Sequence, residues 1–124
     1  MTDNIPDEVR EELYDIHAKT CKAMANKTRI KILDNLKQGE MRVDELAEAL
    51  DTTAPNVSQH LSLLKEVGVV CKRQEKRYAF YSICDHRIVE ACDLVKEVML
   101  DRLQEREESL GRFSRYAEDF KRGK

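Results

Sequence analysis

The feature that most constrains the fold is a change in hydrophobic periodicity partway along the chain. Apolar residues recur at helical spacing in the first half, after which two β-type runs follow, Val69–Arg73 and Arg77–Ile83, with a turn predicted around Glu75-Lys76. Helical spacing resumes after Asp85. The 124 residues therefore predict a single domain (1–124) that is mainly α with a β-hairpin, an α+β fold.

Four helices are expected before the hairpin. The first covers residues 1–24 and has a partial apolar face, and the second begins after Asn26, a good N-cap residue. A short third helix is expected from about Asp44 to Leu50. Thr53 can cap a fourth helix, in which Pro55 is tolerated in the first turn.

The third and fourth helices, residues 43–66, are joined by a three-residue turn. A helix–turn–helix followed directly by a basic hairpin, residues 69–83, describes a winged helix-turn-helix. A long last helix, residues 86–110, carries apolar residues on one side, and residues 111–124 form a charged tail. The first and last helices have more apolar surface than the rest can cover, which predicts that they form a dimer interface.

The outer face of the fourth helix is unusual for a solvated surface. Opposite its apolar stripe, which is formed by Val57, Leu61 and Leu64, it carries short hydroxyl and amide side chains in place of the usual Glu and Lys. Asn and Gln can bond bidentately to adenine, and Ser and Thr reach base edges or phosphates. The alternative is a solvated polar helix without such a task. The candidate DNA-binding residues here are Thr53, Asn56, Ser58, Gln59, His60, Ser62 and Lys65.

The hairpin adds positive charge around its turn. Arg73, Lys76 and Arg77 cluster there with Lys72, and only Glu75 opposes them. Cations held beside a major-groove helix can contact phosphates or enter the minor groove. Lys and Arg also prevent edge strands from pairing, which is the alternative interpretation. The polar face of the fourth helix and the basic hairpin, in the order that a winged helix requires, together favour DNA binding.

The net charge of −2 and the pI near 6.0 count weakly against a nucleic-acid partner. The charge is unevenly distributed, however. Residues 1–17 hold six acidic residues and one basic residue, and residues 85–110 hold eight acidic and four basic residues. Residues 55–84, which include the expected DNA-binding elements, hold five basic and two acidic residues. The field over that region is therefore predicted to be positive.

Several classes of protein are not supported by the sequence. No apolar run approaches the roughly 18 residues that span a bilayer, and the N-terminus lacks the apolar core of a secretory signal. We find no Gly-rich phosphate loop, nucleophile elbow or paired His/carboxylate set, so an enzyme is not expected. The four cysteines form no CxxC pair. We expect a cytoplasmic protein with reduced thiols and no membrane partner.

Four strings in unbroken order from Lys22 to Asp85 match a known family: KAMANKTRIKILDNL, MRVDELAEAL, TTAPNVSQHLSLLKEVGVV and KRYAFYSICD. The most specific part is SQHL at Ser58–Leu61, followed by Leu64 and Gly68. The chain resembles the ArsR/SmtB family of winged-helix repressors. The resemblance implies a homodimer that binds a palindromic operator in double-stranded DNA and is released by an effector. The alternatives are a winged-helix protein-interaction module and a regulator with no metal effector.

Two metal sites that the resemblance implies are not intact here. A Cys-Val-Cys-type box on the third helix corresponds to Met41–Asp44, which has no thiolate. A carboxylate–imidazole site on the last helix keeps Asp85, but the nearby His position is Arg87 and a later ligand position falls at Val98. Neither Arg nor Val supplies a zinc ligand. No cofactor is therefore predicted at either of these two sites.

The remaining effector candidates are thiols. Cys21 and Cys92 lie on the first and last helices, so in a dimer their sulfurs could share one layer. They could then form a disulfide or persulfide link, or bind a thiophilic metal or metalloid ion such as As(III); the alternative is that both only pack. Cys71 and Cys84 are not expected to face each other, because the predicted turn pairs position 71 with about 80. Cys84 could instead join Cys92.

Overall fold

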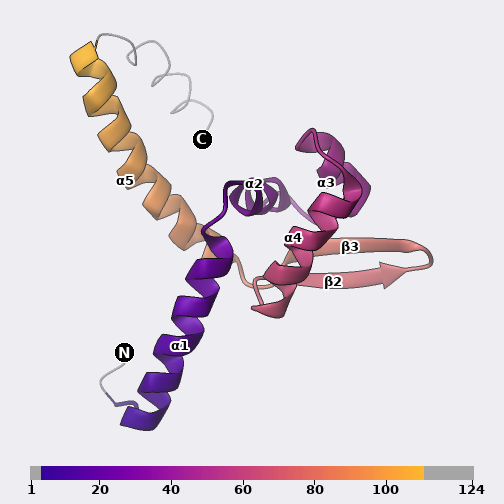
Figure 1. Cartoon of the computed structure of the whole chain (residues 1–124), viewed down its shortest axis with the longest axis horizontal. Helices are drawn as coiled ribbons and strands as arrows, with labels where there is room; N and C mark the ends of the chain where they lie inside the picture. Colours follow the sequence, from indigo (N-terminus) through magenta and orange to yellow (C-terminus); the bar gives the residue numbers. More distant parts are fainter. Residues whose placement is uncertain (1–3, 111–124) are drawn as a thin grey trace. The chain divides into compact units, whose positions relative to one another are not determined.

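The computed structural model describes residues 4–110, with side chains described up to residue 108. These residues form two compact units, one ending at His86 and the other beginning at Arg87. The elements in chain order are α1 (Asp7–Met24), α2 (Lys27–Leu36), β1 (Met41–Arg42), α3 (Val43–Ala49), α4 (Ala54–Glu66), β2 (Val70–Glu75), β3 (Tyr78–Ile83) and α5 (His86–Leu110), as Figure 1 shows. The predicted charged tail lies outside the described residues.

Side-chain caps begin α2 and α4, as the sequence predicts. The backbone N–H of Arg29 donates to the Asn26 side chain at 3.1 Å, and that of Asn56 donates to Thr53 Oγ1 at 3.3 Å. Each cap satisfies one of the backbone donors that the first turn of a helix leaves unpaired. Pro55 lies in the first turn of α4, where no helical hydrogen bond needs its missing N–H.

The turn between α3 and α4 closes with a Schellman motif. Asp51 takes a positive φ of 54°, which lets the N–H of Thr52 donate to the carbonyl of Ala47 at 2.9 Å. Asp tolerates the left-handed conformation better than most residues that carry a Cβ. The same motif ends α4, where Gly68 has a φ of 81°. Both helices therefore stop at fixed residues, and α4 leaves α3 in a defined direction.

A three-stranded antiparallel sheet follows, in the order β1-β3-β2. The two-residue β1 was not predicted, because it is too short to show any alternation. The predicted turn at Glu75-Lys76 is wrong by one residue: Glu75 pairs with Tyr78, and Lys76 and Arg77 form the turn. Lys76 has the positive φ of 54° that tight hairpins require. Position 71 consequently pairs with Ser82 rather than with position 80.

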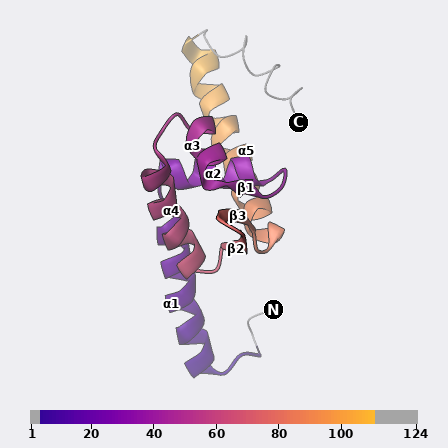
Figure 2. The ribbon, with the colours of Figure 1, turned by 90° about the vertical axis from the view of Figure 1, so that its right-hand side faces the viewer.

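The core of the first unit is built around the inner side of α4. Val57, Leu61 and Leu64 are fully buried, as the predicted stripe requires. They belong to one core with Ile32 of α2 and Leu46 of α3, and α4 also packs against β2. α4 accordingly lies beside the hairpin in both views (Figure 1, Figure 2). Burying each such side chain contributes roughly 1.5–3 kcal/mol.

α5 makes up almost all of the described part of the second unit. It leaves a row of apolar side chains exposed, namely Leu94, Val95, Val98, Met99 and Leu103. Within the described range, no helix combines the length and the hydropathy needed to cross a membrane.

Replacement of Leu61 by Ala tests the central place of α4 in the core. We expect Leu61→Ala to lower the free energy of unfolding by about 2–5 kcal/mol, because it leaves a cavity where the side chain is fully buried. Ser62→Ala, one residue along on the exposed face, should change it by no more than about 0.5 kcal/mol. Urea denaturation followed by circular dichroism measures both. Equal effects of the two variants would contradict this description of the core.

Candidate nucleic-acid interface

The outer face of α4 is a shallow, open surface that carries several hydroxyl and amide side chains. Because Val57, Leu61 and Leu64 are buried, the helical period turns the hydroxyl and amide side chains away from the core. The lining residues are Pro55, Asn56, Ser58, Gln59 and Ser62. Six of the seven residues predicted on this helix are exposed or belong to this lining, and the exception is His60. The surface can therefore meet the edges of bases.

The side chains on this face differ in how firmly they are held. The Nδ2 of Asn56 donates to Thr52 Oγ1 at 3.0 Å, and Thr53 is used by the helix cap. Ser62 Oγ donates to the carbonyl of Ser58 at 3.0 Å. Gln59 is exposed and makes no hydrogen bond within the described part of the chain. Its amide can therefore both donate to and accept from a base without breaking an internal contact.

His60 lies at the inner margin of the predicted face. It is half-buried, and the pKa of its imidazole is lowered first by burial and then by the positive charge of Arg29 on α2. Both effects favour the neutral ring. A neutral histidine supplies one donor and one acceptor, rather than a cation for a phosphate.

Two lysines meet where α4 approaches the hairpin. Lys65 of α4 and Lys72 of β2 line a shallow depression with Ser62, Glu66 and Tyr81. The sequence indicated each lysine separately, but only the register of β2 against β3 brings Lys72 to the side of the sheet that faces α4. Two ammonium groups on the lining of one depression can contact a phosphate of the nucleic-acid backbone.

Arg73 is held by acidic neighbours rather than directed outward. Its guanidinium contacts Glu40 at 2.6 and 3.1 Å and Glu75 at 2.6 Å, and it lies 4.4 Å from the centre of the Phe80 ring. These hydrogen bonds hold the pKa of Glu40 below its usual value. Two carboxylates offset the charge of Arg73, so it ties the hairpin to the segment before β1. Glu40 was not predicted, since 33 residues separate it from Arg73.

The remaining predicted cations, Lys76 and Arg77, form the tip of the hairpin. Both are exposed, and Arg77 lies 5.6 Å from the centre of the Tyr78 ring. The tip projects beyond α3 and α4 (Figure 1). This arrangement matches a wing, whose cations reach DNA beside the groove that the recognition helix occupies.

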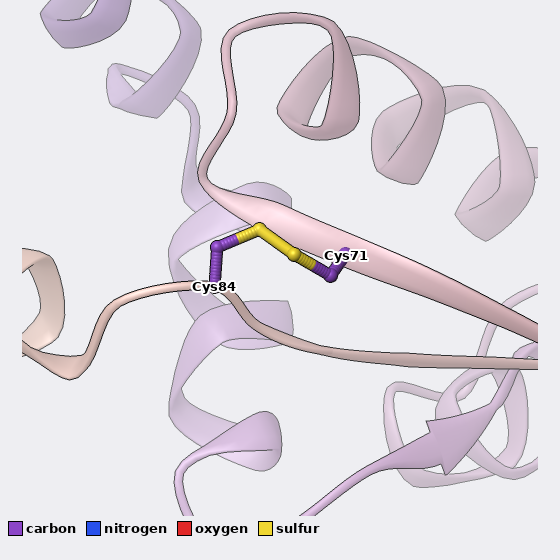
Figure 3. Close-up of a disulfide and its surroundings, with 2 residues drawn as sticks. All are labelled: Cys71 and Cys84. Carbon is purple, nitrogen blue, oxygen red and sulfur yellow. A yellow bond between two sulfur atoms is a disulfide. The ribbon is translucent and has the colours of Figure 1, made fainter.

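The four cysteines are arranged differently from the prediction. Cys71 and Cys84 form a disulfide with a Cα–Cα distance of 5.3 Å (Figure 3). The expectation that they would not face each other is wrong, because the turn lies one residue later and brings position 84 diagonally across from 71. Cys84 is therefore not a partner for Cys92 in this state. Cys21 is exposed on α1, and Cys92 lies on α5 in the second unit.

No group of three or more His, Cys, Asp or Glu side chains within residues 4–108 is arranged to hold a metal ion.

Comparison with known proteins identifies the family. Residues 26–72 match the profile described as bacterial regulatory protein, arsR family. The chain is 38% identical over 88 residues to the HTH-type transcriptional regulator MJ1325 of Methanocaldococcus jannaschii. The aligned region covers 70% of this chain and 99% of MJ1325. The chain belongs to the ArsR family.

Relatives with assigned functions and solved structures agree with this placement. The ArsR-family chain is 36% identical over 77 residues to the transcriptional repressor SmtB of Mycobacterium tuberculosis, covering 62% of this chain and 57% of SmtB. Its fold matches Mb0332 of Mycobacterium bovis, a homodimeric winged helix-turn-helix DNA-binding domain described as a possible ArsR-family regulator. That match has a TM-score of 0.73 and 32% identity, and covers 83% of this chain and 94% of that one.

The contact between Arg73 and Glu40 predicts a specific pH dependence. Since the pKa of Glu40 is lowered in the folded protein, the contact stabilises the fold above the usual Glu pKa and is lost as the pH falls through the lowered value. In Arg73→Ala, the pKa of Glu40 should rise toward its usual value, as measured by NMR titration of the carboxyl carbon. Lys76→Ala should leave it unchanged. An unaltered Glu40 titration in Arg73→Ala would exclude the contact in solution.

Proposed function

We propose that this ArsR-family protein is a homodimeric transcriptional repressor that binds a palindromic operator and is released by an effector. The observation that carries the proposal is the exposed amide and hydroxyl face of α4 beside a basic hairpin. The relatives support it, since they include named transcriptional repressors. Such a regulator acts on DNA in the cytoplasm and catalyses no reaction.

In the proposed complex α4 enters the major groove. Gln59 reads base edges, and Asn56 and Ser58 lie beside it on the outer face of α4. Lys65 and Lys72 contact the phosphate backbone at the edge of the groove, and Lys76 and Arg77 of the wing tip reach the phosphates or the minor groove beyond it. Arg73 ties the wing to the segment before β1 through Glu40.

The small number of unpaired cations near α4 and the wing implies modest affinity for random DNA. Few cations remain on the DNA face once Arg73 is offset by two carboxylates, and the net charge of the chain is −2. Discrimination therefore depends on base contacts and on two half-sites bound at once. A two-fold dimer spaces its recognition helices by roughly 34–36 Å, one turn of DNA.

Exposed apolar rows on two helices support the homodimer. Val9, Leu13 and Ile16 follow one side of α1 at helical spacing and are 41–54% exposed. On α5, Val95 and Val98 are 60% and 51% exposed. Rows of this kind on monomeric surfaces are uncommon and mark sites of association. The related Mb0332 domain is homodimeric.

Cys21 and Cys92 are the proposed effector site. They lie on the two helices assigned to the dimer interface, and a disulfide, a persulfide link or a thiophilic ion could join thiols brought together there. Joining or modifying the thiols of Cys21 and Cys92 would alter the dimer interface and thereby the spacing of the two recognition helices.

The alternative function is a winged helix that binds another protein without reading DNA. A gel shift with the DNA upstream of the protein's own gene separates the two, because an interaction module would retard neither that duplex nor a random one.

Gln59 and Arg77 test the proposed division between base reading and phosphate contact. Gln59→Ala should weaken operator binding by about 1–3 kcal/mol and leave random duplex almost unaffected, because it removes a base contact. Arg77→Ala should weaken both, and should reduce the slope of log K against log salt by about 1. Fluorescence anisotropy over a range of salt concentrations measures these effects. If the two variants behave alike on both duplexes, Gln59 does not read bases.

A charge placed in the apolar row of α5 tests the dimer. We expect Val98→Asp to convert the dimer to a monomer at micromolar concentration, because it would bury an unpaired carboxylate in the interface. Glu90→Gln, an exposed position on the same helix, should remain dimeric. Sedimentation equilibrium distinguishes the two masses. A dimeric Val98→Asp variant would place the interface elsewhere.

A further inference from the structure

The wing carries a cysteine pair that the proposed function does not use. Cys71 is the second residue of β2, and Cys84 directly follows β3, where its N–H donates to the carbonyl of Val69 at 3.1 Å. Their Cα atoms are 5.3 Å apart, within the range that a disulfide bridges without moving the backbone. Both residues are exposed, which opens the pair to small reagents. Figure 3 shows the bond between their sulfurs.

The pair lies at the base of the wing and encloses its turn and nearly all of both strands. Residues 71–84 form a closed loop that contains the tip cations Lys76 and Arg77. β2 pairs only with β3, and every side chain from Cys71 to Glu75 is exposed, although Arg73 contacts Glu40. β1 pairs only with Phe80 and Tyr81, so the outer part of the wing has two strands, with one further contact from Arg42 to the Tyr78 ring. Such hairpins are marginally stable by themselves.

Exposed disulfides are the ones that exchange readily with thiols, and disulfides in reducing compartments are usually transient or redox-sensing. We propose that Cys71 and Cys84 form a redox-modification site, at which a low-molecular-weight disulfide oxidises the dithiol and thereby raises the affinity of the wing for DNA. The effect on affinity rests on the proposed DNA-binding function, whereas the exchange chemistry does not.

The oxidation proceeds by two exchanges. The thiolate of one cysteine attacks a sulfur of the small disulfide RSSR, which forms a mixed disulfide and releases one RS⁻ that takes up a proton. The thiolate of the other cysteine then attacks the protein sulfur of the mixed disulfide, which forms the Cys71–Cys84 bond and releases the second RSH. The dithiol thus loses two electrons and two protons, and RSSR becomes two RSH.

The closed loop binds DNA more tightly because it is already ordered. In the dithiol form the strands can fray and shift, and the wing loses that freedom when its tip settles on DNA. The disulfide fixes the base of the hairpin and so removes part of that cost. We expect oxidation to lower the Kd about three- to tenfold, the size of effect that ordering one short segment produces.

The exchange is tested by mass spectrometry on the full chain carrying Cys21→Ser and Cys92→Ser, so that only this pair can react. After reduction and treatment with glutathione disulfide, the protein should lose two hydrogens and resist alkylation. With Cys71→Ser added, Cys84 should stop at the mixed disulfide with glutathione. If the intact pair also stops there, or remains open to alkylation, the site is not a redox pair.

The effect on DNA is tested by anisotropy with a duplex from upstream of the protein's own gene. The Kd should be about three- to tenfold lower for the oxidised than for the reduced protein, whereas Cys71→Ser and Cys84→Ser should bind like the reduced form under both conditions. Ser82→Ala, on the same face of the sheet, should keep the response. Circular dichroism confirms that each variant is folded.

The outcomes separate the two proposals. Equal Kd values for the oxidised and reduced protein overturn the regulatory role of the pair. A response that disappears in the variant carrying Cys21→Ser and Cys92→Ser assigns it to those cysteines instead, and likewise overturns the inference. If neither redox form binds any DNA, the proposed function fails, while the mass measurement still decides whether the pair exchanges.

Discussion

Burial of the inner side of α4 is the interaction on which the rest of the structure depends. Val57, Leu61 and Leu64 are fully buried in the core that α2, α3 and β2 share with α4. Because a helix has a fixed period, this packing turns Gln59 and its polar neighbours outward. The Schellman motif after α3 and the Thr53 cap set where the helix begins. Core packing and the proposed DNA recognition thus use opposite sides of one helix.

The wing depends on a different kind of constraint, in which charge and register act together. One added residue of strand before the turn places Cys71 opposite Ser82 and brings Cys84 within disulfide distance. The same register sets Lys72 beside Lys65 near α4 and leaves Arg73 on the other face, against Glu40 and Phe80. Two cations adjacent in sequence therefore have different surroundings: Lys72 lies beside α4, at the proposed phosphate contact, and Arg73 is paired with two carboxylates at the surface.

The helices and the polar face of α4 could be predicted because their signals are local. Caps at Asn26 and Thr53 and the apolar spacing within α4 depend on residues a few positions apart. The hairpin turn was predicted one residue too early. Positions 75–77 are Glu, Lys and Arg, and none of them is the Gly or Asn that usually marks a tight turn. β1 is only two residues long and is a strand only because it pairs with Phe80 and Tyr81.

The sequence by itself determined the family, the helix–turn–helix and the face that α4 presents, because helical periodicity and capping act over a few residues. Only the tertiary structure decided which charges and thiols are available. Glu40 offsets Arg73 from 33 residues away, and Cys84 bonds to Cys71 from 13 residues away. Contacts of that kind depend on how strands align in space, where a shift of one residue changes every partner.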